Sequence, residues 1–178
     1  MSDGRKKTLL RSIRITQDLD GILQADARAK RVSVNALISI LITKYAEWDR
    51  YTEKFGFVSL TREGLRGILE AAEEEKLTKA AEDLGARIGK EFMMFRFKKV
   101  NVKTFLEGLS LFARYGGIAE WEADSDGRSH TIAAHHDLGA KWSSYLGRLL
   151  DRIMETSLRI VPQVELTKTS VILRFSEH

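Results

Sequence analysis

The segment "LLRSIRIT", residues 9–16, decides how the first part of this chain is interpreted. Ile13 and Ile15 alternate with polar neighbours, which is the period of a β-strand with one buried face. The opposite, outward face of such a strand presents Leu10, Ser12 and Arg14. A strand needs a partner, and no neighbouring segment offers one. We therefore expect it to pair with the same strand of a second copy.

Two helices are predicted directly after this strand. Thr16 is placed to cap a helix that begins at Gln17, and Ser33 is placed to cap a second helix over about residues 34–49. The second helix contains "ALISILITKYAEW", which is apolar on more than one face. One strand and one short helix cannot cover it within about 50 residues, so it must be buried against another chain.

The net positive charge of the chain comes entirely from this first part. Residues 1–50 contain ten Lys/Arg and six Asp/Glu, whereas residues 51–178 contain nineteen of each. A basic N-terminal segment followed by a domain without net charge indicates a polyanionic partner.

A strand, a helix, a short turn with a capping Ser and a very apolar helix resemble the ribbon-helix-helix (MetJ/Arc-type) DNA-binding family. The segments that resemble it are "RSIRITQDLDGIL" and "AKRVSVNALISILITKY", within residues 8–50. Two departures are Arg31, where the family usually has Gly in the turn, and Arg11, at a usually apolar position.

The resemblance implies that two strands form an antiparallel ribbon in the DNA major groove. The base-contacting residues would be Leu10, Ser12 and Arg14. The phosphate-contacting residues would come from the basic arm and from the start of the second helix, namely Arg5, Lys6, Lys7, Arg11, Ser33, Val34 and Asn35. The dimer core would contain Ile13, Ile15, Leu37, Ile38 and Leu41.

The rest of the chain, residues 57–178, is predicted to be a separate α+β domain with antiparallel strands packed by helices. In chain order we expect a short strand "FVSL" (57–60), a helix after Thr61, a helix over about 73–97 and a helix after Asn101 that ends at "YGG". A hairpin around "DSDGR", a long helix over about 137–158 and a closing hairpin follow. The fold class is thus α+β, mainly helical, with domains at 1–50 and 57–178.

This order is similar to that of the 4-vinyl-reductase-like small-molecule-binding domain. The similar segments are "DLGARIGKEF", "LFARYGGIAEWEA" and "LGAKWSSYLGRLLDRI". Members of that family often have cysteines after the long helix and in the last hairpin, where the resemblance implies a metal site. This chain has no cysteine. The resemblance therefore implies a scaffold for dimerisation or for an apolar ligand, without that metal site.

Few residues of the second domain suggest chemistry. His130, His135 and His136 are close in sequence, but a strand would put His135 on the opposite face, so we expect no metal site. "FMMFRF" (92–97) could line a ligand pocket, although core packing is the expected role. No nucleophile triad or Gly-rich phosphate loop stands out. We expect neither an enzyme nor a cofactor.

Composition indicates the compartment. The chain has no cysteine, no signal-like apolar segment at its start and no apolar run long enough to cross a membrane, so we expect a cytoplasmic protein without membrane contact.

The sequence as a whole predicts a DNA-binding transcription regulator, a repressor in the simplest case, that binds double-stranded DNA as a homodimer or as a tetramer. The C-terminal domain would serve oligomerisation or the sensing of a small-molecule effector. The alternatives are an antitoxin that binds its toxin through the C-terminal part, a structural dimer without DNA binding, and a metal or small-molecule enzyme.

Overall fold

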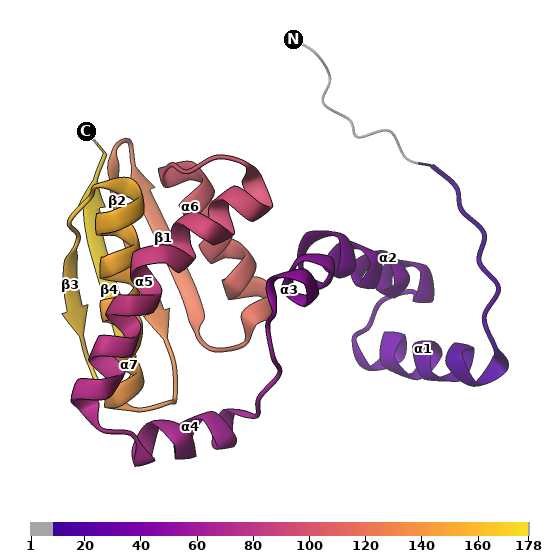
Figure 1. Ribbon diagram of the computed structural model, residues 1–178. Helices are drawn as coiled ribbons and strands as arrows, with labels where there is room; N and C mark the ends of the chain where they lie inside the picture. Colours follow the sequence, from indigo (N-terminus) through magenta and orange to yellow (C-terminus); the bar gives the residue numbers. More distant parts are fainter. Residues whose placement is uncertain (1–8, 178) are drawn as a thin grey trace, which may run out of the picture. The chain divides into compact units, whose positions relative to one another are not determined.

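The computed structural model describes residues 9–177, which form two compact units that divide between Ala46 and Glu47 (Figure 1). The sequence placed the boundary a few residues later, within residues 50–56. Each unit is described by itself. Within the described residues, no helix combines the length and the apolar character that crossing a membrane would need.

The first unit contains two helices with the predicted caps. Helix α1 spans Gln17–Ala29, and the Thr16 hydroxyl accepts a hydrogen bond from the Leu19 N–H at 3.5 Å. Helix α2 spans Val34–Lys44, and the Ser33 hydroxyl accepts one from the Ala36 N–H at 3.1 Å. Both caps satisfy N–H groups that a helix start leaves without partners.

The turn between these helices contains a strained residue. Arg31 has φ 55°, the left-handed region in which glycine is favoured. This is the position where the sequence departs from the glycine usual in ribbon-helix-helix turns.

Helical structure continues beyond α2. A π-helical turn, η1 (Tyr45–Asp49), is followed by α3 (Arg50–Phe55), which ends at Gly56 with φ 86°. The strand predicted at residues 57–60 is wrong, because this segment pairs with no strand. Phe57 instead packs among the rings of Trp48, Phe55 and Phe112.

The second unit has an α+β fold and, apart from the strand expected at residues 57–60, the predicted order of elements. After α3 its helices are α4 (Arg62–Ala71), α5 (Glu74–Phe97), α6 (Val102–Leu111) and α7 (Ala140–Ile153), with π-helical turns η2 (Phe112–Gly116) and η3 (Met154–Leu158). Its strands are β1 (Glu120–Asp126), β2 (Ser129–His135), β3 (Gln163–Leu166) and β4 (Ser170–Ser176). They form one antiparallel sheet in the order β1-β2-β4-β3.

Local signals explain where these elements begin and end. The Thr61 hydroxyl caps α4, and Asn101 and Thr104 form a reciprocal capping box at the start of α6. Gly117, with φ 68°, ends the helical segment at "YGG", and Gly127, with φ 62°, lies in the β1–β2 turn. These predictions are confirmed.

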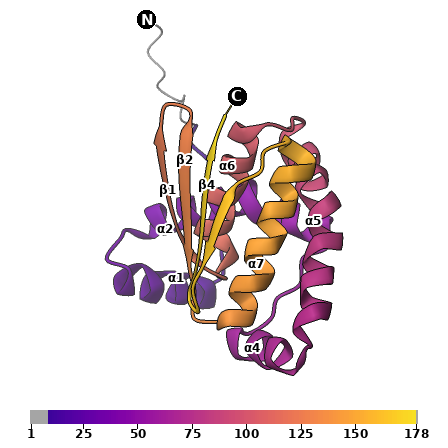
Figure 2. The same cartoon turned by 90° about the vertical axis from the view of Figure 1, so that its left-hand side faces the viewer.

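The sheet has one covered face and one open face. Ile132, Ala134, Val171 and Leu173 are buried on the covered face, on which α7 packs, with α5 on the outer side of α7 (Figure 2). The open face of edge strand β1 presents a row of alternate carboxylates, which are Glu120, Glu122, Asp124 and Asp126.

Glycines allow α5 and α7 to pack closely. A Cβ placed on Gly89 would lie 2.3 Å from Ile153 Cγ2, and one placed on Gly85 would lie 2.8 Å from Arg152 Cβ. On the other side of α7, a Cβ on Gly147 would lie 2.6 Å from Leu166 Cδ2 of β3. Helix α7 is therefore held closely on both sides.

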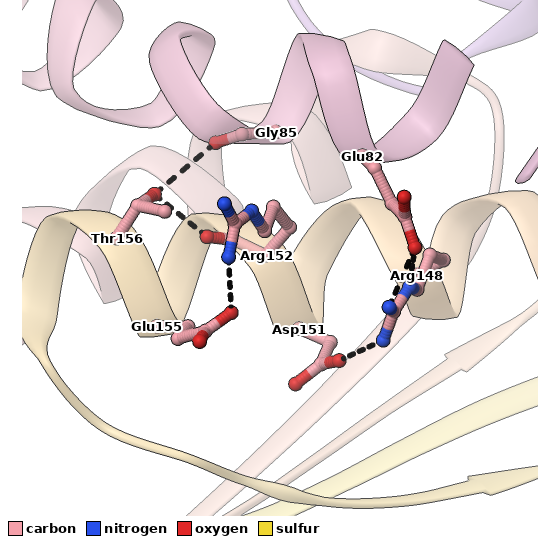
Figure 3. A network of polar contacts seen from close by, with 7 residues as sticks. All are labelled: Glu82, Gly85, Arg148, Asp151, Arg152, Glu155 and Thr156. Carbon is pink, nitrogen blue, oxygen red and sulfur yellow. Dashed lines mark hydrogen bonds and ion pairs between the residues drawn. The ribbon is translucent and has the colours of Figure 1, made fainter. Parts of the chain in front are cut away.

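Ion pairs border this helix contact (Figure 3). Arg148 of α7 donates to Glu82 of α5 at 2.7 Å through Nε and to Asp151 at 2.9 Å through Nη1. Arg152 donates to Glu155 at 2.6 Å. These side chains are partly exposed, so water screens them and they add little to stability compared with the buried contact.

The glycine contact can be tested by adding one methyl group. We expect Gly89→Ala to lower the free energy of unfolding by about 1–3 kcal/mol, because the clash with buried Ile153 outweighs the higher helix propensity of Ala. Gly67→Ala in α4 is the matched control, since nothing lies within 4 Å of its added methyl group. It should instead stabilise by about 0.5–1 kcal/mol. Urea unfolding measures both, and equal effects of the two variants would contradict the packing argument.

Candidate nucleic-acid interface

The predicted base-contacting residues all lie on exposed chain. Residues 9–16 form neither helix nor strand in the single copy, and Leu10 is 92% exposed. Ser12 and Arg14 are exposed as well. The β-ribbon requires the strand of a second copy, so it stays a prediction.

The residues predicted to contact phosphate include the start of α2. Ser33 and Asn35 are exposed and Val34 is half-buried. The N–H groups of a first helical turn have no partners within the helix and favour an anion. The geometry is therefore that of a helix N-terminus accessible to a phosphate.

Two residues that the sequence interpretation did not select adjoin this helix start. Lys30 and Arg31 are both exposed and precede the Ser33 cap by three and two residues. Arg31 has a left-handed backbone conformation and is separated from the cap by Val32 alone. The signal that would have found them is the basic pair "KR" just before the capping Ser.

The basic arm is described only in part. Arg11 is exposed. The predictions for Arg5, Lys6 and Lys7 lie outside the described residues.

The predicted dimer core is largely uncovered in a single copy. Leu37 is buried and Ile38 is half-buried, but Ile13 is 61% exposed and Leu41 is 48% exposed. Ile15 is exposed too. Other large apolar side chains that are exposed in this unit are Leu9, Leu10, Leu19, Ile22, Val32, Ile40, Ile42 and Tyr45. Among the described residues of the unit, the buried hydrophobic side chains are Ala27 and Leu37, which is too little to stabilise it alone.

The histidines of the second unit do not converge. His130 is buried between Ser125, at 2.8 Å, and Glu177, at 2.9 Å, and it stacks on Phe175. His136 lies beyond the other end of β2, about 20 Å away at the usual rise of a strand, and His135 is exposed. Within residues 9–177, no group of three His, Asp or Glu side chains is arranged to hold a metal ion.

His136 has a structural environment. Its Nδ1 accepts a hydrogen bond from the Leu138 N–H at 3.3 Å, so the proton of the neutral ring is on Nε2, 2.9 Å from the Ser143 hydroxyl of α7. Burial lowers the pKa of His136 from its ordinary value, partly opposed by Asp137. The neutral imidazole therefore links the end of β2 to α7.

Neither a scan against protein-family models nor a search of curated proteins found a match to this chain. The resemblances of both domains therefore stay predictions.

The His136 environment predicts a pH dependence of stability. Because the folded pKa is lowered, the unfolded chain binds more protons, and stability falls as the pH drops below about 6.5. Wild type should lose more unfolding free energy between pH 7.5 and pH 5 than His136→Asn, measured by urea unfolding. His135→Asn is the matched control; it removes only a minor cause of the lowered His136 pKa, so it should keep most of the wild-type slope. A His136→Asn variant with an unchanged slope would assign the pH dependence to other groups.

Proposed function

We propose that this protein is a sequence-specific, DNA-binding transcription regulator that acts as a homodimer. The observation on which the proposal chiefly depends is the first unit, in which an exposed basic segment precedes two helices with their apolar side chains uncovered. Two chains would pair residues 9–16 into a ribbon that enters the major groove.

The charge distribution supports a DNA partner. The net positive charge resides in residues 1–50, and Arg11, Arg14, Lys30 and Arg31 are all exposed. Such contacts to phosphates provide salt-dependent affinity without sequence information. Arg14 and Ser12 on the ribbon would provide the sequence preference, with Arg14 donating to guanine O6 and N7.

The lack of a core in the first unit supports the dimer. Units of about 40 residues usually need a disulfide, a metal or a partner chain to fold, and this chain contains no cysteine. A second copy would cover the exposed side chains of α1, α2 and residues 9–16 at once. The resulting two-fold symmetry implies a roughly palindromic DNA site.

The second unit would then serve oligomerisation or effector sensing. If it pairs two dimers into a tetramer, the DNA half-sites should repeat at about one helical turn, roughly 10 base pairs.

The antitoxin alternative predicts a C-terminal segment that folds only on its toxin. The extensive buried core of the second unit does not favour it, since Ile132, Met154, Val171 and Leu173 are almost fully inaccessible. The alternative of a structural dimer predicts no salt-sensitive binding to any DNA.

Loss of one ribbon side chain tests the base contacts. A duplex is first selected from a random pool by the wild-type protein. We expect Arg14→Ala to weaken binding to this duplex by about 1–3 kcal/mol, with little change for a scrambled duplex. Arg28→Ala removes the same charge from α1 and should preserve the ratio between the two duplexes. If Arg14→Ala also preserves that ratio, the ribbon does not determine the sequence preference.

A charge in the apolar face tests the dimer. We expect Leu41→Glu to weaken the dimer by at least about 3 kcal/mol, because two leucine side chains lose their burial and two carboxylates take their place. Sedimentation velocity at several concentrations measures this effect. Leu60→Glu, at an exposed leucine of the second unit, is the control and should leave association unchanged. A Leu41→Glu protein that dimerises as wild type does would disprove the proposed interface.

A further inference from the structure

The second unit contains a large cavity that is partly open to solvent. Its volume is about 590 Å³. Its wall is formed by residues of α5, α6 and α7, by the residues around Gly56, by Ile118 and by Trp121 of β1. Protein interiors are close-packed, with few voids larger than a water molecule. A volume of this size lies in the range of small-molecule sites.

The wall is apolar, aromatic and uncharged. Eight of its 22 residues are aromatic, and it includes no Asp, Glu, Lys, Arg or His. Phe92 and Met93 of "FMMFRF" are buried and belong to this wall, so the expectation that this segment serves only core packing is incomplete. A charged ligand group would have no counter-charge inside the cavity, which favours an uncharged occupant.

The wall offers few polar atoms to an occupant. The Thr104 hydroxyl is already used within the α6 capping box, where it accepts from the Asn101 N–H at 3.1 Å. The indole Nε1 atoms of Trp121 and Trp142 have no acceptor among the described residues, but they are almost inaccessible and do not reach the surface of the cavity. A buried N–H without an acceptor costs free energy comparable to a lost hydrogen bond.

Tyr145 is the remaining polar group. Its ring stacks on Trp142, with ring centroids 5.4 Å apart, and burial raises the pKa of its hydroxyl. The hydroxyl is therefore protonated at neutral pH and can donate. An occupant with an acceptor oxygen could bind the Tyr145 hydroxyl, whereas a pure hydrocarbon would leave this hydroxyl without a partner.

We propose that this cavity binds an uncharged, mainly apolar small molecule with fused or linked rings and a carbonyl or ether oxygen, which accepts a hydrogen bond from the Tyr145 hydroxyl. The use of such a molecule as an effector would rest on the proposed function, but the binding itself does not.

The test uses the full-length protein without DNA and three related naphthalene probes. The first is 6-propionyl-2-(dimethylamino)naphthalene, an uncharged ketone whose fluorescence shifts to the blue in apolar surroundings. The second is 6-(dimethylamino)-2-naphthoate, its anionic counterpart, and the third is 2-(dimethylamino)-6-propylnaphthalene, which lacks the acceptor. We expect the ketone to bind once per chain and the anion to bind at least about ten-fold more weakly.

Variants then locate the site. Leu109→Trp fills the cavity from α6 and should weaken ketone binding at least about ten-fold, as should Leu149→Trp from α7, which serves if the first variant does not fold. Leu60→Trp adds the same volume at an exposed position outside the wall and should bind as wild type does. Tyr145→Phe removes only the hydroxyl, so it should weaken ketone binding by about three- to ten-fold and leave binding of the propyl compound unchanged.

Several results would overturn the proposal. Equal affinity for the ketone and the anion would contradict an uncharged site, and full binding by folded cavity-filling variants would place the site elsewhere. An unchanged ketone affinity of Tyr145→Phe would disprove the proposed hydrogen bond. Ketone affinity that falls as protein concentration rises would mean that a second copy covers the opening. Because no DNA is present, failure of the DNA-binding proposal leaves this result intact.

Discussion

The close contact of α5 and α7 at Gly85 and Gly89 is the constraint on which the second unit depends. Gly89 leaves room for Ile153, and Gly147 brings the opposite side of α7 against Leu166 of the sheet. A side chain at any of these positions would push one layer away from the next. The contact involves backbone and buried atoms, so it cannot be relieved by rotating a surface side chain, and it sets the spacing of the three layers.

Helix α7 uses its two faces differently because of this spacing. Ser143 and Gly147 are buried, and Gly147 faces the sheet, whereas Tyr145, Leu149 and Leu150 line the cavity. The close contact of Gly89 with Ile153 is itself part of the cavity wall. The core thus combines a tight helix contact with a sizeable cavity beside it.

Local signals made most of the elements predictable from the sequence. The caps at Thr16, Ser33 and Asn101, the turn at Gly127 and the apolar periodicity of α5 and α7 each depend on residues close in the chain. The failures involve distant contacts. The segment "FVSL" has the composition of a strand, but its Phe57 packs among aromatic rings from three other elements. The cavity likewise depends on residues from Phe55 to Ile153, and no short pattern reveals it. The ribbon of the candidate interface depends on a second chain altogether.

The row of carboxylates on β1 has a consequence for the behaviour of the protein at high concentration. An edge strand presents unpaired backbone groups and invites another sheet to join, which is a common start of aggregation. On β1 any in-register copy would bring Glu120, Glu122, Asp124 and Asp126 close to an identical row of like charges. The strand is thereby protected against self-association.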